Sequence, residues 1–477
     1  MYDVIIIGAG IVGCSTAYWL SQYEMSIAVL ETHNDVANGT TKANTGCMHA
    51  GYDPQPGSLM AKYNVEGSAM GKQLCEKLAV PYENCGSLVV AHTKEDMKTI
   101  EELYQRGKQN GVKELYLLDE KQTRELQPRL SGNVKGSLYA KTGAIVDPWQ
   151  FAIALAEVAV ENGVALKLNN EVKAITKKEG IFTITTNKDK YQCRYIINAA
   201  GVYSDVVHEM IGEKEFTIIP VRGQYFLLDK NEGEKVQLML FQSPSQKGKG
   251  VAVCPTVHGN MIVGPDAETV ESEDLATTAE ALKYIKEQSK LTMDCINYRD
   301  NIRNFAGIRA RSDRGDFIIE ESKSVKNFYN LAGIASPGLT AGCAIGYHVI
   351  DWLNTKENFV KKQNYQETRR KIRFKELSFA EKNELIAKNP AYGRIVCRCE
   401  HVTEGEILDC FSSPIPPQSI DAVKRRTNAG MGRCQSGFCG ERVAMILKEK
   451  LNIEFNEILL DKEGSKILMN KAKEGDY

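Results

Sequence analysis

The sequence predicts an α/β protein of three parts, and three observations support this prediction. An apolar run at residues 4–7 meets a glycine-rich turn and a helical stretch at 14–21, and a second apolar run at 27–30 follows, as in a β-α-β unit. Over residues 217–264, short strand-like segments alternate with loops that contain Gly, Pro and Asn, which is typical of an antiparallel sheet. Near the C-terminus, four cysteines form two tight pairs, which indicates a small separate module.

Length and composition limit the function classes. A chain of 477 residues exceeds one ordinary core, so we expect two or three domains. Its 60 Lys and Arg balance 61 Asp and Glu, which argues against a nucleic-acid binder held by bulk charge. We find no signal peptide and no apolar run of about 18 residues, so we expect a cytoplasmic protein that contacts a membrane at most through a partner.

Further elements follow from periodicity along the chain. Residues 32–57 are rich in Gly, Asn, Thr and Pro and predict a long functional loop. Residues 354–390 are charged, and we interpret them as a helical connector whose charges face solvent. We expect helices over 59–78, 94–110, 148–162 and 340–353, and strands over 165–168, 181–186, 195–198, 218–228, 237–241, 250–254, 261–263 and 328–331.

The first turn carries a dinucleotide fingerprint. Gly8, Gly10 and Gly13 have the spacing G-x-G-x-x-G between a strand and a helix, and the next strand ends at Glu31, 18 residues after Gly13. Gly8 permits the sharp turn, Gly10 the approach of a pyrophosphate, and Gly13 close helix–strand packing. The helix N-terminus offers N–H groups to phosphates, and Glu31 can accept hydrogen bonds from ribose hydroxyls. The fingerprint predicts a Rossmann-like domain but does not distinguish NAD from FAD.

Four stretches resemble the D-amino acid oxidase-like family of FAD-dependent oxidoreductases. They are the fingerprint, the loop Gly-Thr-Thr-Lys-Ala-Asn-Thr-Gly at 39–46, the strand and turn at 197–201, and Gly-Ile-Ala-Ser-Pro-Gly-Leu-Thr at 333–340. Within this family, residues 47–52 and 56–59 resemble the L-2-hydroxyglutarate oxidase side, whereas the C-terminal module resembles anaerobic glycerol-3-phosphate dehydrogenases. The aerobic glycerol-3-phosphate enzymes usually carry an Arg shortly after the segment equivalent to Gly51, and this chain has none there.

The resemblance implies the ligands of the flavin. A helix N-terminus at residues 338–340 would stabilise the negative charge of the reduced flavin. The implied FAD-binding residues are Gly8, Gly10, Gly13, Glu31, Thr40, Thr41, Asn44, Val172, Ala200, Gly201, Gly333, Gly338, Leu339 and Thr340.

Oxidation of a secondary alcohol also needs a base for the hydroxyl proton and a cation for the anionic end of the substrate. His49, in the family's loop against the flavin, is the candidate base; the alternative is a loop histidine that only forms hydrogen bonds. Arg309 matches the family's substrate-side arginine and can clamp a carboxylate or phosphate; the alternative is a salt bridge between domains. Arg222, Tyr225 and Arg311 are secondary substrate candidates.

The C-terminal cysteines predict a metal centre. Cys397 and Cys399 form a C-x-C pair, Cys434 and Cys439 a C-x4-C pair, and 34 residues separate the pairs. Four thiolates in two pairs suit an iron–sulfur cluster or a structural zinc. The spacing resembles the bacterioferritin-associated ferredoxin-like module, which favours a 2Fe–2S cluster. We interpret the other nine of the 13 cysteines as packed, inert thiols.

These inferences combine into one predicted organisation. The FAD-binding domain comprises residues 1–75, 140–215 and 320–355, and an inserted α+β substrate domain comprises 76–139 and 216–319. A connector spans 356–392, and the helical 2Fe–2S module with a C-terminal tail spans 393–477.

The predicted function is a dehydrogenase rather than an oxidase, because a cluster on the same chain suits transfer to an electron-accepting protein or quinone-linked partner. The preferred substrate is sn-glycerol 3-phosphate. The alternatives are L-2-hydroxyglutarate, an amino or imino acid, or an electron-relay subunit without its own substrate.

Overall fold

The computed structural model describes residues 1–244 and 250–469. Its first sheet has eight strands in the order β10-β11-β12-β1-β2-β9, with β20 beside β12 and β19 beside β20. β1 pairs in parallel with β2 and β12, as a β-α-β opening requires. The strands of this sheet are β1 (Tyr2–Ile7), β2 (Ile27–Leu30), β9 (Ala165–Lys167), β10 (Val172–Lys178), β11 (Ile181–Thr186), β12 (Lys190–Asn198), β19 (Ile318–Glu321) and β20 (Phe328–Ala332).

Helices cover the first sheet and join it to the rest of the molecule. α1 (Ile11–Leu20) packs between α5 (Pro148–Glu161) and α9 (Gly338–Asn354), and α2 (Leu59–Lys77) packs on α9. α6 (Ser204–Glu209) contacts β20. The helices expected over 59–78, 148–162 and 340–353 are confirmed within two residues at each end.

The second sheet has nine strands in the order β17-β13-β16-β15-β14-β5-β7-β6, with β18 beside β13. Its longest strand pairing is the antiparallel one of β13 and β18, which runs from Ile218 opposite Ser312 to Leu228 opposite Asn301. Its strands are β5 (Ser87–Ala91), β6 (Leu115–Asp119), β7 (Gly136–Ala140), β13 (Ile218–Leu228), β14 (Met239–Gln242), β15 (Ala252–Pro255), β16 (Met261–Gly264), β17 (Glu268–Thr269) and β18 (Asn301–Ser312). Around it lie α3 (Lys94–Gln109), α4 (Glu120–Leu126), α7 (Lys230–Gly233) and α8 (Ala279–Thr292).

Between these sheets lies a small three-stranded sheet of β3 (Cys47–Met48), β4 (Tyr82–Glu83) and β8 (Ala144–Val146). The long loop predicted over 32–57 is present, and it also contains a short 3-10 helix, Thr40–Lys42. The strands β3–β8, β10 and β17–β19 were not predicted. β18 carries Asn, Arg and Gly along its length, so it lacks the apolar alternation by which strands are recognised.

The prediction of a helical connector is wrong for most of its length. Residues 356–373 contain no helix, and α10 covers Phe379–Lys388 alone. This segment is held in place by α5 and by the turn that follows α1: Arg369 pairs with the buried Glu157 at 2.5 Å, and Lys362 N donates to Gln22 O. Its charges are therefore partly paired with the protein surface rather than all solvated.

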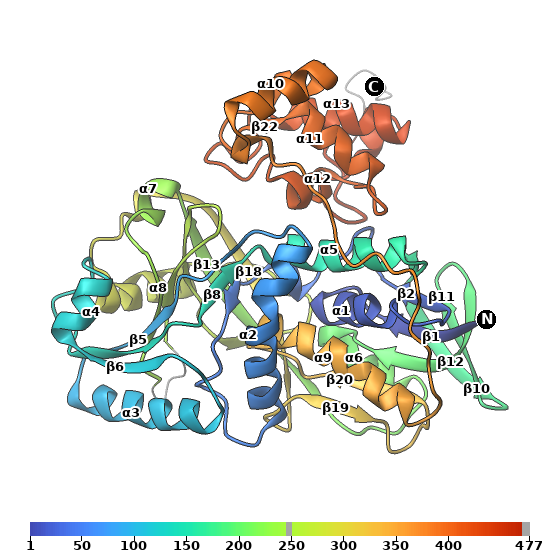
Figure 1. Cartoon of the computed structure of the whole chain (residues 1–477), viewed down its shortest axis with the longest axis horizontal. Helices are drawn as coiled ribbons and strands as arrows, with labels where there is room; N and C mark the ends of the chain where they lie inside the picture. Colours follow the sequence, from blue (N-terminus) through green and yellow to red (C-terminus); the bar gives the residue numbers. More distant parts are fainter. Residues whose placement is uncertain (245–249, 470–477) are drawn as a thin grey trace, which may run out of the picture.

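The C-terminal module lies beyond α5 at the end of the extended segment (Figure 1). It contains β21 (Ile395–Cys397), β22 (Val402–Thr403), α11 (Glu404–Asp409), α12 (Ile420–Thr427) and α13 (Gly440–Leu451) around its own apolar cluster. Residues 470–477 of the predicted tail lie outside the described residues. Across the part of the chain that the structure describes, no helix is both long and apolar enough to cross a bilayer.

Candidate active site

One cavity of about 1330 Å³ runs from the glycine turn of the first sheet to β13 and β18 of the second. It exceeds the size of a typical site for one small ligand, so it has room for a dinucleotide and a substrate. The predicted cofactor residues that line it are Gly8, Gly10, Glu31, Thr40, Thr41, Asn44, Val172, Ala200, Gly201, Gly333, Gly338 and Leu339. Gly13 and Thr340 are not among its lining residues.

The glycine turn leaves no space for side chains. Gly8 has φ +100°, and a Cβ there would lie 2.5 Å from Ala199 O. A Cβ on Gly13 would lie 1.9 Å from Gly8 O, where α1 crosses the turn. Gly13 therefore serves the close helix–strand packing that its position in the fingerprint predicts.

Two side chains hold this turn from outside. The Glu31 carboxylate accepts a hydrogen bond from Ala9 N at 2.7 Å through one oxygen and from His33 N at 2.9 Å through the other. Thr41 Oγ1 accepts a hydrogen bond from Ile11 N at 3.0 Å, at the start of α1. The end of β2 and the loop thus shape the N-terminus of α1, which directs the positive end of the helix dipole to the cavity.

The loop from Thr40 to Gly46 is fastened to β18 of the second sheet and is braced by hydrogen bonds of its own. Thr40 Oγ1 donates to Ile308 O of β18 at 2.6 Å. Asn44 Nδ2 donates to Thr41 O, and its Oδ1 accepts from Gly46 N, both at 2.8 Å. These contacts join the predicted cofactor loop to the strand that carries the substrate candidates.

Thr340 does not line the cavity itself but positions His49, which does. The Thr340 side chain is fully buried, and its Oγ1 accepts a hydrogen bond from His49 N at 2.9 Å. Asn64 Nδ2 donates to His49 O at 2.6 Å. The backbone of His49 is therefore fixed on both sides, with its ring in the cavity wall 5.5 Å from the Phe241 ring.

The second sheet contributes three of the predicted substrate residues to the cavity: Tyr225, Arg309 and Arg311. Arg309 and Arg311 are two positions apart on β18, so they share a face. Arg309 Nη2 donates to Asp266 O at 3.2 Å, and Tyr225 stacks on Phe305 with ring centres 4.8 Å apart. Sequence reasoning missed Asp266 and Phe241, which line the cavity from strand ends without a motif.

Arg222 does not reach the cavity. It is 3% exposed, and its guanidinium pairs with Glu268 and Asp274, each at 2.7 Å. Arg222 is three residues from Tyr225 on β13, so the alternation of the strand turns it to the opposite face. The structure therefore places this substrate candidate in an ion-pair network outside the cavity.

The C-terminal module brings its four predicted ligands together as two pairs. Cys399 Sγ and Cys434 Sγ lie 3.7 Å apart, and a hydrogen bond from Cys439 lowers the pKa of Cys397 to about 6. Across residues 1–244 and 250–469, no three or more His, Cys, Asp or Glu side chains are grouped to hold one metal ion. A structural zinc would gather all four thiolates around one ion, whereas two pairs suit two irons.

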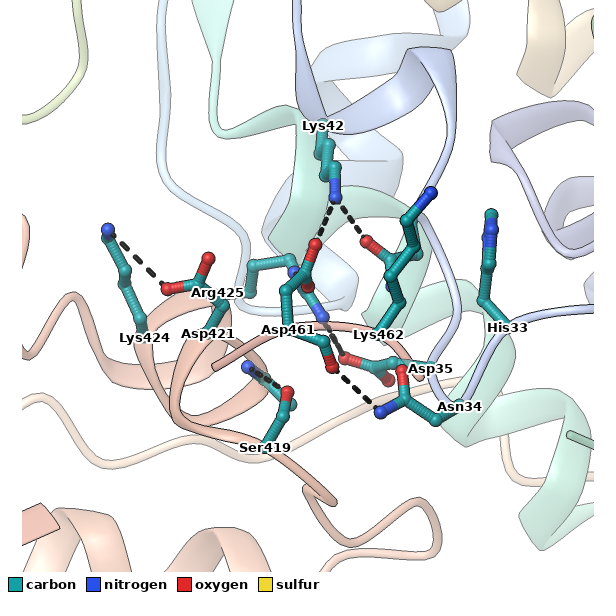
Figure 2. A network of polar contacts seen from close by, with 12 residues as sticks. His33, Asn34, Asp35, Lys42, Ser419, Asp421, Lys424, Arg425, Asp461 and Lys462 are labelled. Atoms are coloured by element: carbon teal, nitrogen blue, oxygen red, sulfur yellow. Dashed lines mark hydrogen bonds and ion pairs between the residues drawn. The ribbon is translucent and has the colours of Figure 1, made fainter. Parts of the chain in front are cut away.

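Buried charges fasten the module to the nucleotide loop. Arg426 and Arg425 of α12 both pair with Asp35 of the loop, at 2.8 and 2.9 Å, and all three side chains are at most 5% exposed. Asp461 joins Arg425 to Lys42, at 2.8 and 2.6 Å (Figure 2). Burial opposes ionisation of Asp35, but the charges and hydrogen bonds of both arginines outweigh it and lower the pKa of the carboxyl.

The module also contacts the second sheet's domain. Lys230 of α7 pairs with Glu400 at 3.0 Å, and Asn428 Nδ2 lies 2.9 Å from His258 Nδ1. His258 Nε2 in turn lies 2.9 Å from Asp147 Oδ2, at the N-terminus of α5. The cysteine pairs are thus carried on a unit that contacts both large parts of the chain.

Comparison with known proteins identifies the two parts. Residues 3–352 match the family described as FAD dependent oxidoreductase. The chain belongs to this family. Residues 395–449 of the oxidoreductase match the BFD-like [2Fe-2S] binding domain. Both matches confirm what the fingerprint, the loop motifs and the cysteine spacing predict.

Three relatives of the oxidoreductase bear on its function. A glycerol 3-phosphate dehydrogenase of Caloramator mitchellensis is 50% identical over 476 residues, 99% of each chain. The structure of L-alpha-glycerophosphate oxidase from Mycoplasma pneumoniae with FAD bound is 32% identical, with a TM-score of 0.74, covering 77% of this chain and 98% of that one. A mitochondrial L-2-hydroxyglutarate dehydrogenase of Nematostella vectensis is 32% identical over 285 residues, 56% of this chain and 62% of its own.

The residues of this oxidoreductase fit both cofactors. The backbone of the turn, free of Cβ atoms at Gly8 and Gly13, leaves N–H groups at the start of α1 for the pyrophosphate of FAD. The paired thiols match the donor set of a 2Fe–2S cluster, and a Cβ on Gly432 would lie 2.2 Å from that of Cys399. A glycine there lets the backbone approach this ligand closely.

Proposed function

We propose that this chain oxidises the secondary hydroxyl of sn-glycerol 3-phosphate to give dihydroxyacetone phosphate, and passes the electrons through its 2Fe–2S cluster to an external acceptor. The main support is the 50% identity to a glycerol 3-phosphate dehydrogenase over 99% of both chains, because this similarity spans the flavin part and the cysteine module together.

The geometry of the cavity supports an anionic hydroxy substrate. Arg309 and Arg311 bring two cations to the wall of the cavity, and Tyr225 lines the same cavity further along the neighbouring strand, opposite Phe305. We assign Arg309 to hold the phosphate, since a guanidinium can offer two parallel hydrogen bonds to it. Dianionic phosphate binding at a single residue would leave charge unpaired, so Arg311 is the second cation.

His49 is the base in this proposal. Its backbone is fixed by Thr340 and Asn64, so its ring has a defined position in the wall of the cavity. The imidazole takes the proton of the substrate hydroxyl as the C–H bond breaks, which is the role that a histidine suits near neutral pH. FAD, when bound, supplies the acceptor for the hydride.

The electron exit favours a dehydrogenase. The Mycoplasma pneumoniae oxidase aligns over 98% of its own length, yet about a quarter of this chain has no counterpart in it. The share without a counterpart is large enough to hold the connector and the cysteine module, and such a module suits a one-electron route to a protein or quinone-linked partner.

L-2-hydroxyglutarate is the second candidate substrate, supported by the 32% identity to its mitochondrial dehydrogenase. The same two arginines suit its carboxylates. An electron-relay subunit would need neither His49 nor cations in the cavity wall, so the residues of the cavity favour an enzyme.

Anaerobic bleaching of the flavin tests the proposal. Purified holoenzyme is mixed with glycerol 3-phosphate, L-2-hydroxyglutarate, sarcosine or proline, and the flavin absorbance is followed by stopped flow. We expect rapid bleaching by glycerol 3-phosphate. Bleaching by L-2-hydroxyglutarate alone would replace the substrate, and no bleaching by any compound, in flavin that dithionite reduces, would favour the relay subunit.

Arg309→Met sharpens this test. It removes charge-assisted hydrogen bonds of about 1.5–3 kcal/mol, so the concentration of glycerol 3-phosphate for half-maximal bleaching rate should rise about 10- to 100-fold. Arg303→Met is the matched control, because Arg303 lies on the same strand, is exposed and does not line the cavity. Equal effects of the two substitutions would remove Arg309 from the substrate site.

A further inference from the structure

Two thiols that do not belong to the cluster module meet at the wall of the cavity. Cys47 Sγ and Cys254 Sγ lie 3.7 Å apart. Both residues are buried, at 4% and 0% exposure, and 207 positions separate them in the sequence. Cys47 is on β3 beside the nucleotide loop, whereas Cys254 is on β15 of the second sheet. A bond between them would link the two large parts of the chain.

The pair is reachable through the cavity. Cys47 lines it, as does Ala252 at the start of β15. A small oxidant that enters the cavity therefore meets the Cys47 sulfur although the outer surface of the protein covers both thiols. His49, the base of the proposed reaction, is two residues further along the chain.

The two thiols are not equivalent. The hydrogen bond with Cys254 lowers the pKa of Cys47 despite its burial, and a hydrogen bond with Thr45 adds to this effect. The same pairing and burial raise the pKa of Cys254. The thiolate is the reactive form of cysteine, so Cys47 has the character of the attacking thiol and Cys254 that of the resolving thiol.

We propose that Cys47 and Cys254 form a redox-active dithiol that a hydroperoxide converts to a disulfide, which slows turnover. The Cys47 sulfur attacks the nearer peroxide oxygen, the O–O bond breaks, and the leaving oxygen departs as water after taking a proton. The sulfenic acid that results is attacked by Cys254: the S–S bond forms, the S–O bond breaks, and a second water leaves. With hydrogen peroxide, the two thiols lose two electrons and two protons, and the peroxide becomes two waters.

Bond formation must move the loop that carries His49. A disulfide has an S–S distance of about 2.05 Å, so the sulfurs approach by about 1.6 Å from their present 3.7 Å. Part of this shift falls on β3, which leads directly into His49. A displacement of about 1 Å at a reacting group can cost about 100-fold in rate, so we expect anaerobic bleaching by substrate to slow by about that factor.

Peptide mass mapping tests the disulfide without any substrate, so its outcome is separate from that of the proposed function. Holoenzyme purified without oxygen is treated with hydrogen peroxide, alkylated and digested. We expect a cross-linked pair of peptides that contain Cys47 and Cys254, lighter by two hydrogens than their sum and split by dithiothreitol. Dithiothreitol should also restore the rate at which substrate bleaches the flavin. Damage to the cluster by peroxide does not affect this rate, so it cannot account for the inhibition.

Two variants make the result specific. Cys254→Ser should abolish the cross-link and leave Cys47 as a sulfenic acid that dimedone labels. Peroxide should then slow flavin bleaching less than it does in the parent protein. Cys295→Ser, which removes an exposed thiol outside the cavity, should form the cross-link as before. Oxidation of Cys295 shows that the peroxide has acted on the protein. If Cys47 and Cys254 are then still fully alkylated, the proposal is overturned. A disulfide between Cys47 and its neighbour Cys85 would also overturn it.

Discussion

The turn at Gly8–Gly13 and the C-terminal module bind their cofactors with different parts of the chain. In the turn, the backbone forms the binding surface, and Gly8 and Gly13 matter because a Cβ at either position would lie 2.5 Å or less from another backbone atom. In the module, four side-chain sulfurs are the predicted ligands, and the backbone brings them into two pairs. The first site should therefore fail by steric collision and the second by loss of a ligand, each with its own spectroscopic signature.

The largest effect is expected from Gly13→Ala. The new methyl group would lie 1.9 Å from Gly8 O, a backbone atom that cannot move without opening the turn. We expect protein without bound flavin, and hence without any substrate oxidation, measured as the ratio of flavin to protein absorbance.

Gly132→Ala is the control for that substitution, since a Cβ at this exposed glycine meets no atom within 4 Å. A yellow Gly13→Ala protein with the parent flavin content would contradict the backbone-built site.

Cys434→Ser should remove the cluster and leave the flavin site intact. A serine oxygen replaces one thiolate of the Cys399 pair, so the cluster should be lost while flavin content and anaerobic bleaching stay at the parent level. Electron paramagnetic resonance after dithionite reduction would follow the cluster. Loss of flavin together with iron would show that the two sites are not independent.

Cys410→Ser is a suitable comparison, because Cys410 is buried in the same module but belongs to neither cysteine pair. Its cluster signal should persist.

Arg426→Met tests the attachment of the module to the nucleotide loop. It leaves the buried Asp35 with Arg425 as its remaining cation, and breaking a buried pair costs about 3–5 kcal/mol. We expect faster tryptic cleavage within residues 356–373 and a lower free energy of unfolding of the module.

The double variant Asp35→Leu/Arg426→Met should recover much of this loss, because an apolar replacement of a buried ion pair is often close to neutral. If the double variant is as unstable as the single one, packing of the arginine stem and not its charge holds the module.

The smallest effect is expected from Thr41→Val. It removes the acceptor of Ile11 N and leaves a buried N–H unpaired at the start of α1, which costs about 1–3 kcal/mol. The free energy of unfolding of the apoprotein should fall by about this amount, and bound FAD should restore part of it, since a phosphate can accept the hydrogen bond. Thermal unfolding with and without FAD measures both effects. Thr41→Ser keeps the hydroxyl and should unfold as the parent does.

Local patterns in the sequence were enough to predict a site where residues close together in the chain form it. Gly8, Gly10, Gly13 and Glu31 belong to one β-α-β unit, so their spacing alone predicts their arrangement, and the C-x-C and C-x4-C pairs predict the donor set of the cluster. The assignments of His49 and Arg309 as base and clamp stay predictions, as do the exact domain boundaries.

The sequence failed where contacts join distant segments. The nine scattered cysteines were interpreted as packed thiols, and no local signal shows that Cys47 and Cys254 meet across 207 residues. The alternation of β13 puts Arg222 and Tyr225 on opposite faces, but only the tertiary structure shows that the face of Tyr225 lines the cavity. No periodicity marks Asp35 as the partner of Arg425 and Arg426, about 390 residues away.

Composition and local spacing thus determined the α/β class, the nucleotide turn and the cysteine ligands, because short-range geometry follows from backbone stereochemistry and residue type. Tertiary structure alone decided which strand faces reach the cavity, how the extended connector lies against the helices, and where the module is anchored. These depend on sheet order and on burial of paired charges, and both are properties of the whole folded chain rather than of any one segment.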